Sequence, residues 1–369
     1  MSGCYMIAGG GTGGHIFPAI AIGEALLAAN AATRVLFVGT AYGMEKDLIP
    51  KQGHTLLTLP VRGLLGKSLA HKAALLWRVP ASLLLSLFYL LRFRPKVVIG
   101  VGGYASAPLL WTAALLRIPT MIQEQNAFPG LANRISSRVA KLACLGFGEA
   151  GTRLRCPSIV TGNPVRKDFR QGGTWSADRP ILLVLGGSQG AAALNRILPE
   201  LLAGVLTPDM NLRVVHQCGK AHEASVRAAY EGAAFQVEVV SFIEDLSKLM
   251  DDVRLVVCRS GASTIAELKL VGVPAVLVPF PRATHDHQTF NAKSLAACGA
   301  ARLIPETELP QAGPILAELL ASSESLANMA AAYPSPGPDS ARVCAQLVHD
   351  LQHKRPLNDI LKEHAAHVS

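Results

Sequence analysis

The two halves of the chain begin in the same way: a short apolar run leads into a glycine-rich loop and then into helix-forming residues. In the first half Met6 to Ala8 precede Gly9 to Gly14, and in the second Ile181 to Leu185 precede Gly186 to Ala191. Short apolar runs bounded by turn residues predict buried strands, and glycine permits the tight turn that follows. The repeat therefore predicts an α/β protein with two Rossmann-like halves.

Further apolar runs alternate with helical patterns in both halves, which is typical of parallel sheets with right-handed crossovers. Strands are expected at residues 6–8, 35–38, 97–99, 120–122, 181–185, 213–216, 237–240, 255–258 and 275–280. Helices are expected at about 19–29, after Gly261, and at 339–351. With 369 residues the chain is too long for one ordinary core. We expect an N-terminal domain of residues 1–163, completed by a return helix at about 339–352, and a C-terminal domain of residues 164–338.

The composition argues against a disordered chain, a zinc protein and a disulfide-stabilised protein. Hydrophobic residues make up 50% of the chain and charged residues 17%, as in a globular protein with large buried sheets. The seven cysteines occur singly, so neither a zinc site nor a disulfide framework is indicated. Residues 1–7 run into a strand without a signal-peptide pattern, and we expect a cytosolic protein.

The net charge of +9 comes from one stretch, because residues 48–123 contain nine Lys and Arg and no Asp or Glu. The other 26 Lys and Arg balance the 26 acidic residues of the chain. The apolar run 73–91 lies within this stretch, but Arg78 and Pro80 interrupt it, which disfavours a membrane span. Either its helices only cover a sheet, or residues 62–96 dock on an anionic membrane surface, which we favour. No nucleic-acid motif is present.

Polar groups are expected to gather at the carboxyl ends of the strands, where such sheets bind ligands. These include the glycine loops, Gln123 to Asn126, and Ser260 to Glu267. The helices after Gly261 and near His287 would open on one sheet edge and could seat a diphosphate. Gly261 would let the chain turn, and Ser263 or Thr264 would cap the helix that follows. Alternatively the stretch is an ordinary strand–turn–helix unit without a ligand, in which Thr264 and Glu267 form a capping box and Glu267 is purely structural.

The glycine loops favour a nucleotide-sugar over other nucleotides. Gly9, Gly11 and Gly14 match Gly-x-Gly-x-x-Gly, but no acidic residue ends the second strand, and Glu45 comes several residues late. An NAD-dependent enzyme is therefore disfavoured. No Gly-x-x-x-x-Gly-Lys-Ser/Thr loop is present either, which argues against a P-loop NTPase.

Six ordered motifs between Met6 and Leu347 resemble the MurG family, the bacterial N-acetylglucosaminyltransferases of peptidoglycan synthesis. The motifs are Gly10 to Pro18, Gly102 to Tyr104, Glu124 to Asn126, Gly162 to Arg166, Gly186 to Gly190 and Cys258 to Ala262. The resemblance implies a GT-B glycosyltransferase fold, with two Rossmann-like domains whose parallel sheets face across a cleft. It also implies UDP-N-acetylglucosamine as donor, the undecaprenyl-linked lipid I as acceptor, and lipid II as product, formed with inversion.

The resemblance also assigns site residues. Ser188 would hold the diphosphate, Ile243 would read the uracil through its backbone, and Glu267 would accept from the ribose. Thr12, Gly13 and Gly14 would close over the donor. The remaining substrate contacts would come from Ala262, Ser263, Thr264, Ile265, Ala266, Gln288, Asn126 and Arg166. The enzyme would act as a peripheral protein on the cytoplasmic face of the inner membrane.

The reaction needs a general base and stabilisation of the leaving diphosphate. His15 is our first candidate for the base, because an imidazole titrates near neutral pH, and Glu124 is the second. His15 could instead only fix the glycine loop by hydrogen bonding. No Asp-x-Asp is present, so we expect no metal or other cofactor, with helix dipoles and Ser188 stabilising the diphosphate.

Two other functions remain open at this point. A related GT-B transferase could act on another lipid, or a non-catalytic protein could bind a nucleotide-sugar at the membrane.

Overall fold

The computed structural model describes residues 3–61, 75–169, 175–187, 190–283, 286–335 and 337–365. The chain divides into two compact units: unit 1 is Met1–Arg166 with Gly337–Ser369, and unit 2 is Lys167–Pro336. The sequence placed these divisions at 163/164 and 338/339, within three residues of those seen here.

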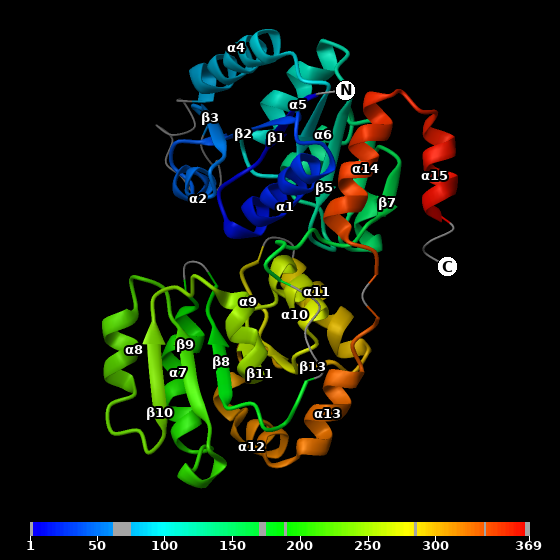
Figure 1. Ribbon diagram of the computed structural model, residues 1–369. Helices are drawn as coiled ribbons and strands as arrows, with labels where there is room; N and C mark the ends of the chain where they lie inside the picture. The colour runs from blue at the N-terminus through cyan, green and yellow to red at the C-terminus, as the bar shows by residue number, and fades with distance from the viewer. Residues whose placement is uncertain are drawn as a thin grey trace. The chain divides into compact units, whose positions relative to one another are not determined.

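Unit 1 is built on a parallel sheet of seven strands in the order β3-β2-β1-β4-β5-β6-β7 (Figure 1). The strands are β1 (Cys4–Ala8), β2 (Arg34–Thr40), β3 (Thr55–Leu59), β4 (Val97–Gly100), β5 (Thr120–Glu124), β6 (Leu142–Leu145) and β7 (Ser158–Val160). Alternation along β1 sends Tyr5 and Ile7 into the core on one face and Met6 and Ala8 into the core on the other. Both faces are buried, which explains the continuous apolar runs of the sequence.

Helices cover both faces of this sheet. They are α1 (Gly13–Ala29), α2 (Glu45–Lys51), α4 (Leu75–Phe93), α5 (Ser106–Leu115), α6 (Leu131–Ser136), the 3₁₀ helix η1 (Gly148–Arg153), α14 (Ser340–Gln352) and α15 (Leu357–Ala365). The core beside Tyr5 takes residues from α1, α14 and α15, and the core beside Met6 takes residues from α4 and α5. The return helix α14 is confirmed, and Asp339 caps it by accepting from the amides of Ala341 and Arg342.

Unit 2 repeats the plan with six parallel strands in the order β10-β9-β8-β11-β12-β13. The strands are β8 (Ile181–Leu185), β9 (Arg213–Gln217), β10 (Gln236–Val240), β11 (Val253–Cys258), β12 (Ala275–Leu277) and β13 (Ala301–Leu303). The α-helices are α7 (Ala192–Ala203), α8 (Glu223–Ala229), α9 (Leu246–Leu249), α10 (Ala262–Val271), α11 (His287–Ala297), α12 (Gly313–Ala321) and α13 (Ser323–Ala331). Three 3₁₀ helices are η2 (Pro208–Met210), η3 (Met250–Asp252) and η5 (Leu309–Gln311). In each unit the first strand lies inside the sheet, the next two strands are added on one side of it, and the later strands are added on the other side. The two Rossmann-like halves are therefore confirmed.

Three local predictions were wrong. Helix α1 begins at Gly13 rather than near Ala19: Pro18 lies in its second turn, where it removes the hydrogen bond to the carbonyl of Gly14 without ending the helix. Strand β12 ends at Leu277 rather than Phe280, because Pro279 has no N–H to continue the ladder.

The third error concerns the start of α10. Gly261 occupies the N-cap position and has no side chain that could cap the helix. Ser263 and Thr264 lie within the helix, so neither of them caps it. Thr264 and Glu267 lie inside the helix and cannot form a capping box. At its other end the helix stops at Gly272, which adopts a left-handed conformation with φ of 70°, as the sequence predicted.

No helix in the described part of the chain is long and apolar enough to cross a membrane.

Two glycine loops of unit 1 meet backbone to backbone, at the carboxyl ends of β1 and β4. Gly103 has φ of +80°, and a Cβ placed on it would lie 2.4 Å from the carbonyl oxygen of Gly10. A Cβ on Gly9 would lie 2.1 Å from Cγ2 of Val101. Only glycine permits this approach, and the turn into α1 depends on it.

We expect Gly103→Ala to lower the free energy of unfolding by about 2 kcal/mol or more, because it combines an unfavourable φ with a backbone overlap. Gly130→Ala is the matched control, since Gly130 has φ of −63° and no atom within 4 Å of an added Cβ. Its change should stay within about 0.5 kcal/mol in urea unfolding. Equal losses in the two variants would contradict this account of the loop contact.

Candidate active site

His15 lies in the first turn of α1, and the contact between the glycine loops places its ring. A Cβ on Gly102 would lie 2.9 Å from Cε1 of His15, so the half-buried ring packs directly on the backbone of the β4–α5 loop. Nδ1 of His15 lies 2.9 Å from Oε1 of Gln125, which follows β5. Three strand ends of unit 1 thus converge on one imidazole, as expected for a ligand-binding edge.

Glu45 fixes the first glycine loop by a hydrogen bond. Its carboxylate is fully buried at the start of α2 and accepts from the amide of Gly11 at 2.8 Å. The same carboxylate accepts from the amide of Thr40 at 2.9 Å and from its hydroxyl at 2.7 Å. Sequence reasoning missed this role, because it weighed Glu45 only as a ribose ligand. An acidic residue at a helix start just after a strand that ends in glycine and threonine was the available signal.

Glu124 is buried, and the loop that follows it hydrogen-bonds both of its oxygens. Oε1 accepts from the amide and side chain of Asn126 at 2.9 and 3.3 Å. Oε2 accepts from the amide of Gly130 at 3.0 Å and from Nδ2 of Asn133 at 2.9 Å. This geometry suits a carboxylate that shapes the loop and orients Asn126, and it favours His15 as the group that takes a proton.

The remaining predicted residues of unit 1 lie around the start of α1. Thr12 is the exposed N-cap, and Gly13 and Gly14 form the first turn, whose amides point out of the helix end. The guanidinium of Arg166 lies 4.6 Å from the centre of the Phe17 ring of the same helix. Arg166 is thereby placed in unit 1 beside the glycine loop.

In unit 2 a second glycine loop follows β8. Gly190 has φ of +78°, and a Cβ there would lie 1.9 Å from the carbonyl oxygen of Cys218. Gln217, at the end of β9, donates to the carbonyl oxygens of Gly187 at 2.9 Å and Ser241 at 3.1 Å. Gln217 thus ties this loop to the segment that carries the half-buried Ile243. Ser188 lies outside the described residues.

Gln217 was also missed from the sequence. Its signal was a polar residue ending a buried strand, but its partners are 30 and 24 residues away.

The starts of α10 and α11 are linked to each other, as predicted for two helix N-termini on one sheet edge. The hydroxyl of Ser260 donates to the carbonyl of Gln288 at 2.8 Å, and Asn291 donates to the carbonyl of Ser260 at 3.2 Å. Oε1 of Gln288 accepts from the amide of Phe280 at 2.9 Å, which orients the side-chain NH₂ group. Arg259 anchors the loop by pairing with Glu306 and donating to two carbonyls.

Residues 262–267 present two kinds of surface. Ala262 and Ile265 are buried, so Ile265 could reach a ligand only through its backbone. Ser263, Thr264 and Ala266 are half-buried, and Glu267 is 7% exposed. The helix end and these polar side chains can receive an anionic ligand.

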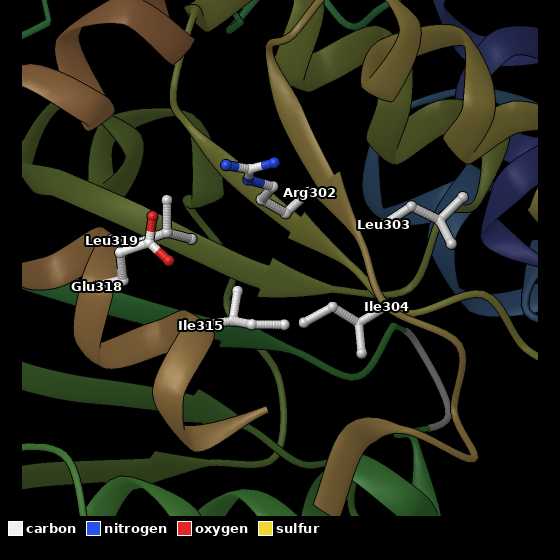
Figure 2. Close-up of a pocket in the computed structure, with 6 residues that line it drawn as sticks. All are labelled: Arg302, Leu303, Ile304, Ile315, Glu318 and Leu319. Atoms are coloured by element: carbon white, nitrogen blue, oxygen red, sulfur yellow. The ribbon is translucent and has the colours of Figure 1, made fainter. Parts of the chain in front are cut away.

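Two other features are separate from this edge. Asp251 and Asp252 are exposed in η3, and the described residues contain no group of three or more side chains suited to a metal. A cavity of about 280 Å³ opens between β13 and α12, where Ile304 and Ile315 face each other and Arg302 lies alongside (Figure 2). None of the predicted site residues lines this cavity.

Both halves of the chain match models of one family. The glycosyltransferase family 28 N-terminal domain matches residues 5–144, and the family's C-terminal domain matches residues 181–341.

Curated relatives match nearly the whole chain. A protein of Syntrophotalea carbinolica is 42% identical over 348 residues, covering 92% of this chain and 97% of the relative. One of Syntrophus aciditrophicus is 44% identical over 308 residues, covering 82% and 85%. Each relative is named UDP-N-acetylglucosamine–N-acetylmuramyl-(pentapeptide) pyrophosphoryl-undecaprenol N-acetylglucosamine transferase.

Solved structures agree with this match. MurG of Acinetobacter baumannii has a TM-score of 0.75 and 33% identity, covering 94% of this chain and 99% of that one. A UDP-N-acetylglucosamine 2-epimerase, with a TM-score of 0.65 and 13% identity, shares the fold alone. With both domain models matched in order and relatives above 40% identity along most of its length, the chain belongs to glycosyltransferase family 28.

Proposed function

We propose that this enzyme transfers N-acetylglucosamine from UDP-N-acetylglucosamine to the 4-hydroxyl of the muramyl residue of lipid I, forming lipid II. The observation that carries the proposal is the 42% identity to a relative of that name over 97% of the relative's length. The glycine loops, the paired helix starts of unit 2 and the placement of His15 supply the chemistry that such a transfer needs.

Unit 2 binds the donor. The diphosphate lies at the starts of α10 and α11 and at the loop after β8, where unpaired amides and helix dipoles favour negative charge. Ser188 and residues 262–266 contact the phosphates, Glu267 accepts from the ribose, and Gln288 contacts the sugar. The backbone of Ile243 reads the uracil, since Gln217 ties its segment to the glycine loop.

Unit 1 activates the acceptor. The 4-hydroxyl oxygen attacks the anomeric carbon and gives its proton to Nε2 of His15, while the bond from that carbon to the UDP oxygen breaks. UDP leaves with the electron pair, and the configuration of the carbon inverts. Residues 12–14, Asn126 and Arg166 supply further contacts to the substrates from unit 1. The leaving diphosphate is stabilised by amides and helix dipoles rather than by a metal.

The enzyme docks on the cytoplasmic face of the inner membrane through unit 1. Helix α4 exposes an apolar stripe, with Trp77, Leu84, Phe88 and Leu91 each at least 57% exposed, spaced so that they share one helix face. Arg92, Arg94 and Lys96 follow the stripe, and α4 packs along α5, whose last residue, Leu115, is 81% exposed. Exposed apolar side chains with cations at one end of the stripe suit an anionic lipid surface. Residues 62–74 of the predicted stretch lie outside the described residues.

Turnover with UDP-N-acetylglucosamine and a lipid I analogue, with and without EDTA, tests the proposal. We expect formation of the disaccharide product at the same rate in both, because no step uses a metal. Loss of turnover in EDTA, restored by Mg²⁺, would contradict the leaving-group chemistry. If the enzyme binds the donor but transfers the sugar only to another lipid, the proposed acceptor is contradicted. If it binds the donor and transfers the sugar to no lipid, the catalytic role is contradicted.

Vesicle sedimentation tests the docking surface. We expect the double variant Leu84→Glu with Phe88→Glu to lower the affinity for phosphatidylglycerol vesicles by about 100-fold or more, because burying each side chain contributes about 1.5–3 kcal/mol. Ile315→Glu in unit 2 is the matched control, since Ile315 is also exposed but lies outside the stripe. Binding of the double variant at the affinity of the control would contradict the assignment.

A further inference from the structure

We propose that Gln125 is a positioning residue that holds His15 in the tautomer protonated at Nδ1, so that Nε2 is the atom that receives the acceptor's proton. This inference deepens the proposed function and rests on it for the identity of the proton donor. Its structural part, the tautomer, concerns only residues of unit 1.

A relay of side-chain amides leads to the imidazole. Nδ2 of Asn163 donates to the backbone carbonyl of Gln125 at 2.9 Å. Oδ1 of Asn163 accepts from Nε2 of Gln123 at 3.1 Å. Oε1 of Gln123 accepts from Nε2 of Gln125 at 2.6 Å, and Oε1 of Gln125 faces Nδ1 of His15 at 2.9 Å. Gln123 and Gln125 are at most 1% exposed, so water does not compete for these bonds.

Backbone carbonyls fix the direction of every amide in this relay. Nε2 of Gln125 also donates to the carbonyl of Val101 at 2.8 Å, and a carbonyl can only accept. Turning the Gln125 amide over would set its oxygen against that carbonyl. Turning Gln123 over would force Asn163 to turn as well, which would set Oδ1 of Asn163 against the carbonyl of Gln125. The oxygen of Gln125 therefore faces His15.

An oxygen that faces Nδ1 requires a proton on Nδ1. In the neutral ring the other nitrogen, Nε2, then carries the lone pair. Among the residues that the structure describes, none hydrogen-bonds Nε2 of His15. The relay thus does with an uncharged amide what a carboxylate does in a hydrolase triad, where it selects the tautomer of the base.

The charged groups on the surrounding elements do not replace this contact. Both oxygens of Glu124 accept from the loop after β5, and both oxygens of Glu45 accept from Gly11 and Thr40. Arg166 lies over Phe17. Gln125 therefore orients the ring through a neutral amide and adds no charge beside it.

In the transfer step the proton of the acceptor hydroxyl moves to Nε2, and the proton on Nδ1 stays in its hydrogen bond to Gln125. Carbon–oxygen bond formation and cleavage leave the electron pair on UDP. The resulting imidazolium donates from both nitrogens, and the oxygen of Gln125 stabilises its positive charge.

Nitrogen-15 NMR of the full chain with labelled histidine tests the tautomer directly. We expect His15, identified by the signal lost in His15→Gln, to show a protonated Nδ1 and an unprotonated Nε2 in the neutral ring. His216 is the internal control: Tyr230 and Asn195 hydrogen-bond its two nitrogens, and burial lowers its pKa to about 4. Its signals should therefore not change across the variants.

Two substitutions separate positioning from a merely structural role. Gln125→Met removes the acceptor oxygen, and we expect a mixed tautomer and a fall in kcat of roughly 10- to 1000-fold, with KM for the donor within about threefold. Gln125→Glu keeps an acceptor oxygen towards Nδ1, and its acid proton can donate to the Val101 carbonyl in place of the amide, so it should restore the tautomer and most of the rate. Gln346→Met, the same change at an exposed glutamine of α14, should leave the rate unchanged.

A protonated Nε2 in the wild-type chain would overturn the proposal, as would a Gln125→Met variant that keeps both the tautomer and the rate. If Gln125→Met does not fold, the tautomer of Gln125→Glu decides alone, and a ring protonated at Nε2 in that variant overturns the proposal. A chain that has the predicted tautomer but transfers no N-acetylglucosamine would refute the proposed function and leave the positioning of His15 standing.

Discussion

The backbone contact between the glycine loops after β1 and β4 is the constraint on which unit 1 depends. A side chain at Gly103 would overlap Gly10, and one at Gly102 would overlap the ring of His15. The contact brings α1 and the end of β4 together, so that the imidazole meets the residues after β5. Glycine is required at these positions because the two backbones approach each other closely. The chemistry of the site depends on which side chains this approach brings within reach of one another.

The two units share a strand order but differ in the side chain that hydrogen-bonds the glycine loop. In unit 1 the buried carboxylate of Glu45 already occupies the amide of Gly11, and its charge disfavours a second anion there. In unit 2 the neutral Gln217 donates to the carbonyl of Gly187 and adds no negative charge. This difference gives a physical reason for assigning the diphosphate to unit 2 and the proton transfer to unit 1, although both loops resemble each other in sequence.

Much of the fold could be predicted from the sequence, because it is carried by local patterns. Short apolar runs such as Ile181 to Leu185 marked buried strands, and Gly272 marked the end of α10. Helix starts were harder to predict: Gly261, rather than Ser263 or Thr264, is the N-cap of α10, because glycine at an N-cap leaves no side-chain signature.

The supporting residues of the candidate site could be predicted least. His15, Gln125 and Asn126 stand in recognisable motifs, but the motifs do not show the distant partners that Glu45, Gln125 and Gln217 find in the fold, which are 34, 110 and 30 residues away in the chain. The bond from Gln125 to His15 spans 110 residues, and only the assembled sheet brings the two together. Such contacts depend on strand order, which local patterns do not specify.

The most direct test of the account is turnover by His15→Ala, measured with and without added imidazole. If Nε2 of His15 receives the acceptor's proton, the variant should lose about 10²- to 10⁴-fold in kcat, and neutral imidazole should restore part of the rate. The tautomer, the glycine contact and the amide relay would then all serve one proton transfer. A variant that turns over at the wild-type rate would show that His15 only braces the loop, and would contradict the account.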